Sequence, residues 1–95
     1  GLDGVLIGPN DMTYNLGIPR QYFHSTQVEV VDEVIKKARA KNIGVGIHVV
    51  YQDSYEQVAR WAKMGANIIL HWVDIMAFRI AMNQELDALR KALEE

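Results

Sequence analysis

Residues 4–11 read GVLIGPND, a short apolar run that ends in a glycine–proline turn and an aspartate. The run VLI closed by GPND fits a strand that is buried on both faces and leads into a turn. Two further runs, residues 43–50 (IGVGIHVV) and residues 66–72 (ANIILHW), are rich in branched apolar side chains. Such runs are typical of buried strands. We therefore predict three strands in this chain.

Helical patterns separate the second and third runs from what precedes them. Residues 12–25 carry Asn, Gly, Pro and Ser among apolar residues, and we expect an irregular loop there. From Thr26 to about Lys41 the apolar residues recur at spacings of three and four, and Thr26 with Glu29 has the spacing of a capping box. A second helix is expected at about 55–64, stopped by Gly65. Its predicted apolar face consists of Tyr55, Val58, Ala59 and Ala62.

A long helix is expected after the third strand. Asp74 is a plausible N-cap for it. Helical spacing then aligns a single apolar stripe made of Ile75, Phe78, Met82, Leu86, Leu89 and Leu93. A helix end in free solvent would gain nothing from three leucines on one face, so the stripe is expected to contact a neighbouring subunit or, alternatively, another part of the same chain.

The order of these elements predicts an α/β fold with a parallel sheet. Each helix has to carry the chain back across the sheet before the next strand begins. A complete eight-stranded α/β barrel needs roughly 250 residues, whereas this chain has 95. Three parallel strands alone leave apolar faces and edges uncovered. We therefore expect a single partial domain over residues 1–95 that needs further strands or other chains.

Composition narrows the class of protein. Hydrophobic residues make up 49% and charged residues 23% of the chain, which is globular composition. The net charge of −2 predicts no nucleic-acid partner, and the cations Lys36, Lys37, Arg39 and Lys41 suit the end of one helix. No apolar run approaches the ~18 residues that span a bilayer, so no membrane partner is expected. The absence of cysteine is common in cytoplasmic enzymes.

Asp11 is the residue most suggestive of chemistry. Ligands of parallel α/β sheets bind at the carboxyl ends of the strands, and Asp11 follows the first strand at that end. A carboxylate is a hard oxygen donor suited to Mg²⁺ or Mn²⁺. The alternative is that Asp11 only closes the Pro-Asn turn, as Asp often does.

The segment GLDGVLIGPNDM at residues 1–12, followed by Leu16-Gly17, resembles the HpcH/HpaI aldolase and citrate lyase β family. In that family a strand ends in Gly-Pro-x-Asp, and Leu-Gly follows five residues after the Asp. The resemblance extends over essentially the whole chain. It implies the C-terminal part of a (β/α)8 TIM barrel, comprising three βα units in the order β-α-β-α-β-α, and a homo-oligomer assembled through the last helix.

The resemblance also implies roles for individual residues. Asp11 would be one ligand of a divalent metal, Mg²⁺ or Mn²⁺, and the backbone N–H groups of Asn10 and Asp11 would face the carboxylate of pyruvate. Gly8 would allow the backbone to approach the substrate. His48 stands where the family places an aliphatic residue near the aldehyde pocket; alternatively it is a hydrogen-bonded histidine that faces a helix. No catalytic residue is assigned within this chain, because the family's catalytic side chains lie upstream.

The activity implied is reversible retro-aldol cleavage of a 4-hydroxy-2-oxo acid to pyruvate and an aldehyde, through a metal-stabilised enolate. A second enzymatic interpretation is an acyl-CoA lyase of the citrate or malyl-CoA branch, for which Arg20 is the one basic residue near the relevant loop. A phosphate-binding barrel is disfavoured, since no glycine-rich turn follows the third strand. A fragment that acts only in assembly is the non-enzymatic alternative.

Overall fold

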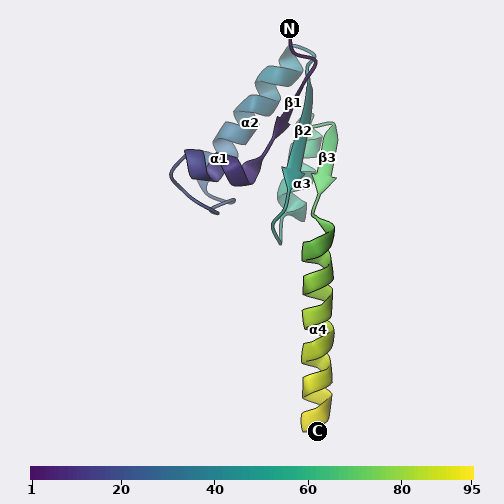
Figure 1. Ribbon diagram of the computed structural model, residues 1–95. Helices are drawn as coiled ribbons and strands as arrows, with labels where there is room; N and C mark the ends of the chain where they lie inside the picture. The colour runs from purple at the N-terminus through teal and green to yellow at the C-terminus, as the bar shows by residue number, and fades with distance from the viewer.

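The computed structural model describes residues 1–95, which form three strands and four helices (Figure 1). In chain order these are β1 (Gly4–Ile7), α1 (Pro9–Asn15), α2 (Ser25–Ala40), β2 (Gly44–Val49), α3 (Tyr55–Met64), β3 (Ile68–His71) and α4 (Asp74–Glu94). The strands pair in the order β1-β2-β3, and both pairs are parallel. The predicted α/β class and the three strands are confirmed, and α3 has the predicted bounds.

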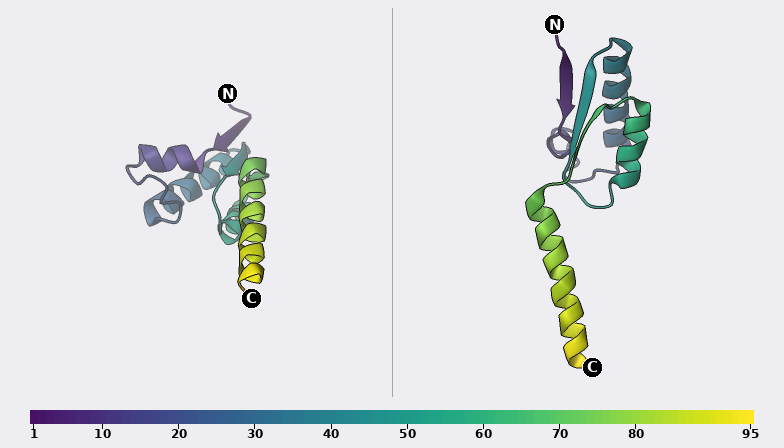
Figure 2. Two further views of the ribbon diagram at one scale, coloured as in Figure 1. Left: turned by 60° about the horizontal axis from the view of Figure 1, so that its bottom comes forward. Right: turned by 90° about the vertical axis from the view of Figure 1, so that its right-hand side faces the viewer.

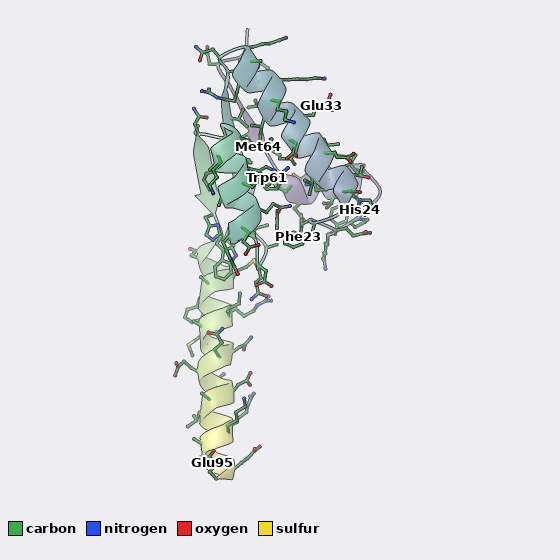
Figure 3. All side chains as sticks on the ribbon, turned by 180° about the vertical axis from the view of Figure 1, so that it is seen from behind. Phe23, His24, Glu33, Trp61, Met64 and Glu95 are labelled. Carbon is green, nitrogen blue, oxygen red and sulfur yellow. The ribbon has the colours of Figure 1, made fainter.

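One face of the sheet is covered by helices. Val45, Ile47 and Val49 of β2 are fully buried, and α2 and α3 lie along this side (Figure 2). Trp61 points from α3 toward α2 and is also fully buried (Figure 3). We call this side of the sheet the helix-covered face. Its apolar side chains form the core of the chain.

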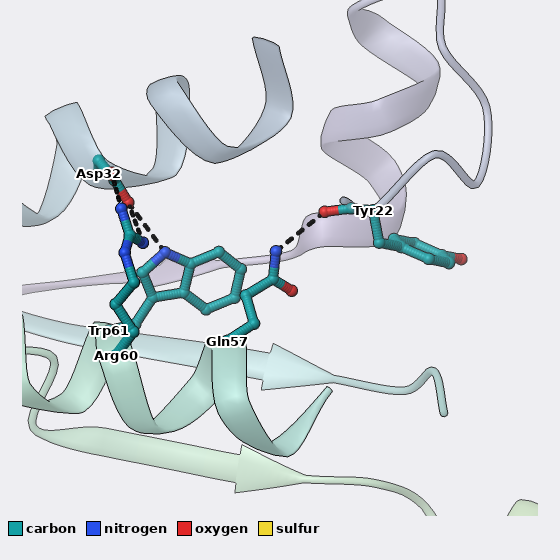
Figure 4. Close-up of polar contacts among 5 residues, drawn as sticks. All are labelled: Tyr22, Asp32, Gln57, Arg60 and Trp61. Carbon is teal, nitrogen blue, oxygen red and sulfur yellow. Dashed lines mark hydrogen bonds and ion pairs between the residues drawn. The ribbon is translucent and has the colours of Figure 1, made fainter. Parts of the chain in front are cut away.

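A polar contact closes the outer edge of that core. The indole nitrogen of Trp61 donates to Asp32 Oδ1 at 3.0 Å, and the guanidinium of Arg60 pairs with the same carboxylate (Figure 4). Burial works to raise the pKa of Asp32, but the hydrogen bonds from Arg60 and Trp61 outweigh it and hold that pKa below its usual value. The buried indole N–H thereby has the partner that a buried donor requires.

The opposite face of the sheet, which we call the open face, has no helix over it. The register aligns Leu6 of β1 with Gly46 and Ile68, and Leu6 and Ile68 are 62% and 55% exposed. A Cβ atom added at Gly46 would lie 2.8 Å from Leu6 Cδ1, so these two neighbours already fill its place. The expectation that the first strand is buried on both faces is therefore wrong within this chain, because nothing in residues 1–95 covers the open face.

Residues 12–25 are more regular than predicted, since the first part of this segment belongs to α1. Pro9 occupies the first turn of α1, where its fixed φ suits a helix and its missing N–H costs no bond. The Thr13 hydroxyl donates to the Asn10 carbonyl at 2.7 Å and anchors the turn. The Gly-Pro-Asn-Asp segment thus starts a helix, and the irregular loop is confined to residues 16–24.

The helix ends differ from the predictions in detail. The side chain of His24 caps α2 by accepting a hydrogen bond from the Thr26 N–H at 3.1 Å, so Thr26 is not the N-cap. Asp74 is the first residue of α4 and follows the N-cap Val73. Gly65 ends α3 with a φ of 122°, as predicted.

The predicted apolar face of α3 is largely wrong. Tyr55 is 67% exposed, and Ala59 and Ala62 are exposed as well. Val58 and Trp61, three residues apart, are the side chains that α3 buries. Trp61 reaches the carboxylate of Asp32 on α2, so the face of α3 that carries Val58 and Trp61 is the one that meets the rest of the chain.

The last helix, α4, leaves the body of the chain and extends away from the sheet (Figure 1). It begins next to the end of β3 and buries none of its residues. The members of its apolar stripe are 42% to 78% exposed, and the helix gives the molecule a longest dimension of 61 Å. No helix is both long enough and apolar enough to span a membrane.

Candidate functional site

The carboxyl ends of the three strands meet at one edge of the sheet because all three strands are parallel. Gly8 follows β1 directly, His48 is the penultimate residue of β2, and His71 is the last residue of β3. Figure 1 shows the three arrowheads pointing to the same side, where α1 and α4 also begin. This edge is where parallel α/β proteins bind their ligands.

Asp11 lies in the first turn of α1 and is exposed at this edge. Gly8 is extended, with φ −103° and ψ 93°, so the alternation of the strand carries through it and a side chain there would point to the open face. A Cβ atom added at Gly8 would lie 3.6 Å from Asp11 Oδ2. The Asp11 carboxylate therefore lies at the open-face side of the strand ends.

The Asp11 carboxylate has no cation partner within the chain. The acidic members of the three ion pairs are Asp32, Glu33 and Asp87. The carboxylate is thus left for a ligand or for residues outside this chain. A 3.6 Å separation is ordinary van der Waals contact, so Gly8 brings the backbone close to Asp11 without being required by space.

His48 projects from the open face of β2. It pairs in register with Leu70 of β3, and it alternates with Ile47 and Val49, which are buried on the helix-covered face. The alternative that His48 faces a helix is therefore not what the structure shows. Extending the β1–β2 register by one pair places Gly8 beside His48, so the imidazole and the Asp11 carboxylate lie at the same end of the same face.

The side chain of Asn10 is already engaged within the chain. Its Oδ1 accepts a hydrogen bond from the Tyr22 hydroxyl at 2.6 Å, and its carbonyl accepts one from the Thr13 hydroxyl. The backbone N–H of Asn10 lies in the first turn of α1, where the N–H groups of a helix have no intrahelical partner, so it can serve a ligand. Burial is the main reason that the pKa of Tyr22 lies above its usual value, which keeps this hydroxyl protonated and able to donate.

A divalent metal fits this edge of the sheet only in part. No three His, Cys, Asp or Glu side chains of the chain lie close enough to hold a metal ion together. Asp11 supplies one carboxylate, the donor type that Mg²⁺ and Mn²⁺ prefer. The donor set of this chain thus fits one ligand position of a metal centre and no more.

A second group of side chains at this edge surrounds a cavity of about 310 Å³ between the β2–α3 loop, the end of β3 and α4. Asp53, His71 and Trp72 are among its lining residues. Trp72 adopts a φ of 66°, and its indole N–H donates to the Tyr51 carbonyl at 3.0 Å. His71 pairs with Val49 rather than with His48, so the two histidines lie on opposite faces of the sheet.

The residues that sequence analysis missed are those that surround Asn10. Tyr22 and Tyr51 lie 29 positions apart, and their rings stack with centroids 3.9 Å apart. Both positions fall in segments predicted only as loops, and neither carries a motif. The one available signal is the presence of aromatic residues in two loops, Tyr22 and Phe23 before α2 and Tyr51 after β2.

The sheet is parallel, with helices on one face and an open apolar face. A carboxylate and an imidazole lie at the carboxyl ends of its strands. These features are those of a part of a parallel α/β barrel. No model of a known protein family matches the chain. The chain is 34% identical over 86 residues to the 2-keto-3-deoxy-L-rhamnonate aldolases of Escherichia coli strains K12 and HS, an alignment that covers 90% of this chain and 31% of each relative. The chain thus spans about a third of the length of the curated relatives it matches.

The fold is similar to that of a solved structure, an HpcH/HpaI aldolase from Desulfitobacterium hafniense DCB-2. The superposition has a TM-score of 0.80 at 23% sequence identity and covers 93% of this chain and 33% of the other. The present chain is thus a fragment of a TIM barrel. Over the portion that it spans, the chain is thus similar in sequence to these aldolases and similar in fold to an HpcH/HpaI aldolase.

Proposed function

We propose that residues 1–95 form the C-terminal βα units of a cytoplasmic, divalent-metal-dependent carbon–carbon lyase. Its reaction is the reversible retro-aldol cleavage of a 4-hydroxy-2-oxo acid to pyruvate and an aldehyde. The relatives at 34% identity are aldolases by name, which supports an aldol reaction. The observation that carries the proposal is the Asp11 carboxylate, which lacks a cation partner and lies at the same end of the open face as His48.

Each residue of the candidate site has a distinct role in this proposal. Asp11 is one ligand of Mg²⁺ or Mn²⁺, and the N–H groups of Asn10 and Asp11 bind the carboxylate of pyruvate. Gly8 allows the backbone to approach the substrate closely. His48 lines the aldehyde side of the site from the open face of β2. A divalent cation held in part by Asp11 would supply Lewis-acid stabilisation of negative charge that develops on the oxygens of the substrate.

The proposed enzyme is a homo-oligomer in which the apolar stripe of α4 contacts a neighbouring subunit. The stripe supports this assignment because α4 buries no residue in the body of its own chain. Small-molecule 2-oxo acids and aldehydes are the proposed reactants.

The deciding experiment uses the full-length protein that contains this chain. Retro-aldol cleavage and exchange of the C3 protons of pyruvate are measured with added Mg²⁺ or Mn²⁺ and after chelation with EDTA. We expect Asp11→Asn to abolish both activities and weaken Mn²⁺ binding while the melting temperature stays near wild type, because the change removes ligand charge but conserves shape.

Asp3→Asn is the matched control, since Asp3 precedes the same strand at its opposite end. It should bind Mn²⁺ and turn over like wild type. Wild-type metal affinity and turnover in Asp11→Asn would refute the assignment of Asp11. Cleavage of a malyl-CoA or citramalyl-CoA substrate in place of the free 2-oxo acid would move the protein to the acyl-CoA branch.

A further inference from the structure

Two tyrosines from different loops stack face to face next to the candidate site. The rings of Tyr22 and Tyr51 are parallel, with centroids 3.9 Å apart, and Phe23 packs edge-on against Tyr51 at 5.7 Å. Tyr22 belongs to the loop between α1 and α2, whereas Tyr51 follows β2 and is 7% exposed. The stack therefore joins the loop after α1 to the end of the strand that carries His48.

Hydrogen bonds through Gln57 also connect the two stacked tyrosines. The Tyr51 hydroxyl donates to Gln57 Oε1, and Gln57 Nε2 donates to the Tyr22 carbonyl at 3.0 Å (Figure 4). Tyr22 is thus held through its ring by Tyr51 and through its backbone by Gln57. Burial raises the pKa of Tyr51, so its hydroxyl remains a donor across the neutral pH range.

The hydroxyl of Tyr22 lies at the turn that carries Asp11. The Tyr22 hydroxyl donates to Asn10 Oδ1 at 2.6 Å. The carbonyls on either side of the Asn10 N–H are also held, Pro9 by Gln27 Nε2 at 3.3 Å and Asn10 by the Thr13 hydroxyl at 2.7 Å. Of these three contacts, only the one from Tyr22 comes from outside the helices α1 and α2.

We infer that Tyr22, supported by Tyr51 and Gln57, is a positioning residue that fixes Asn10 and thereby sets the Asp11 carboxylate relative to the end of β2. This inference rests on the proposed function, because it takes Asp11 as a metal ligand. Residues that orient a metal ligand without binding the metal contribute to metal affinity, and their loss typically lowers that affinity about 10- to 100-fold.

The test is Tyr22→Phe in the full-length protein, a change that removes the hydroxyl and keeps the stacked ring. We expect the dissociation constant for Mn²⁺, measured by titration calorimetry without substrate, to rise about tenfold with little change in melting temperature. Tyr14→Phe is the matched control. Tyr14 lies on α1, is 51% exposed, and should leave Mn²⁺ affinity unchanged.

A double-mutant cycle with Asn10→Ala isolates the hydrogen bond itself. If the two side chains act through one contact, the double variant binds Mn²⁺ as the weaker single variant does, since the effects of coupled residues do not add. Additive effects, or wild-type affinity in Tyr22→Phe alongside loss in Asp11→Asn, overturn the positioning role and leave the proposed function standing. Undiminished affinity in Asp11→Asn overturns both.

Discussion

The helix-covered and open faces of the same three-stranded sheet differ in what this chain supplies to them. On the covered face, Val45, Ile47 and Val49 are fully buried beneath α2 and α3. On the open face, Leu6 and Ile68 are more than half exposed. The apolar stripe of α4 is exposed as well. An apolar pattern therefore predicts that a face will be covered, but it does not say whether the covering group belongs to the same segment of the protein.

The largest expected effect concerns the exposed apolar stripe at the C-terminal end of α4. Replacing Leu86, Leu89 and Leu93 together with Ala should dissociate the proposed oligomer of the full-length protein, because each fully buried Leu contributes about 2–5 kcal/mol. Sedimentation measures the oligomeric state. Gln84→Ala, Asp87→Ala and Lys91→Ala combined is a matched control among the polar residues of the same helix and should leave assembly intact.

The contrary result for that triple leucine variant is an unchanged oligomer with a lowered melting temperature. It would mean that the stripe packs within its own subunit, against another part of the same polypeptide.

The covered face offers a sharper test on a single helix. Trp61→Ala should lower the free energy of unfolding of the full-length protein by about 3–5 kcal/mol, because it empties a fully buried site and leaves Asp32 without the indole donor. Tyr55→Ala on the same helix should change it by less than about 0.5 kcal/mol, since Tyr55 is 67% exposed. Denaturant titration compares them. Equal losses of unfolding free energy would show that Tyr55 is buried in the complete protein. The side of α3 that carries Tyr55 would then be covered as the side that carries Trp61 is.

The smallest expected effect concerns the open face at the strand ends. His48→Leu should change the ratio of kcat/KM between two aldehydes by about tenfold while pyruvate proton exchange is kept, because a side chain in the aldehyde pocket alters specificity and not enolisation. His71→Leu is the control, since His71 lies on the other face of the sheet. If proton exchange collapses in His48→Leu, His48 acts in the chemistry and our assignment of it to the aldehyde pocket is wrong.

Local patterns were reliable where a single physical requirement dominates. Gly65 ends α3 at the predicted residue because its φ of 122° is strained for other residue types. Gly46 marks a strand in which two neighbouring side chains occupy the space of a Cβ atom. Residues 8–11 start a helix and do not form only a turn, because Pro9 suits both structures and the Met12 N–H donates to the Gly8 carbonyl at 3.0 Å, the first backbone bond of the helix.

Sequence patterns are enough to predict the parallel α/β class, the order of the elements and the position of Asp11 at the carboxyl end of a strand. These follow from hydrophobic periodicity and from residues whose backbone preferences act over a few positions. Three features become visible only in the folded chain: His48 lies on the open face, Trp61 and not Tyr55 is buried on α3, and Tyr22 reaches Asn10 while stacked on Tyr51. Each of these depends on side chains that are distant in the sequence or on strand register, and such contacts are set by packing across the whole chain and leave no local pattern to read.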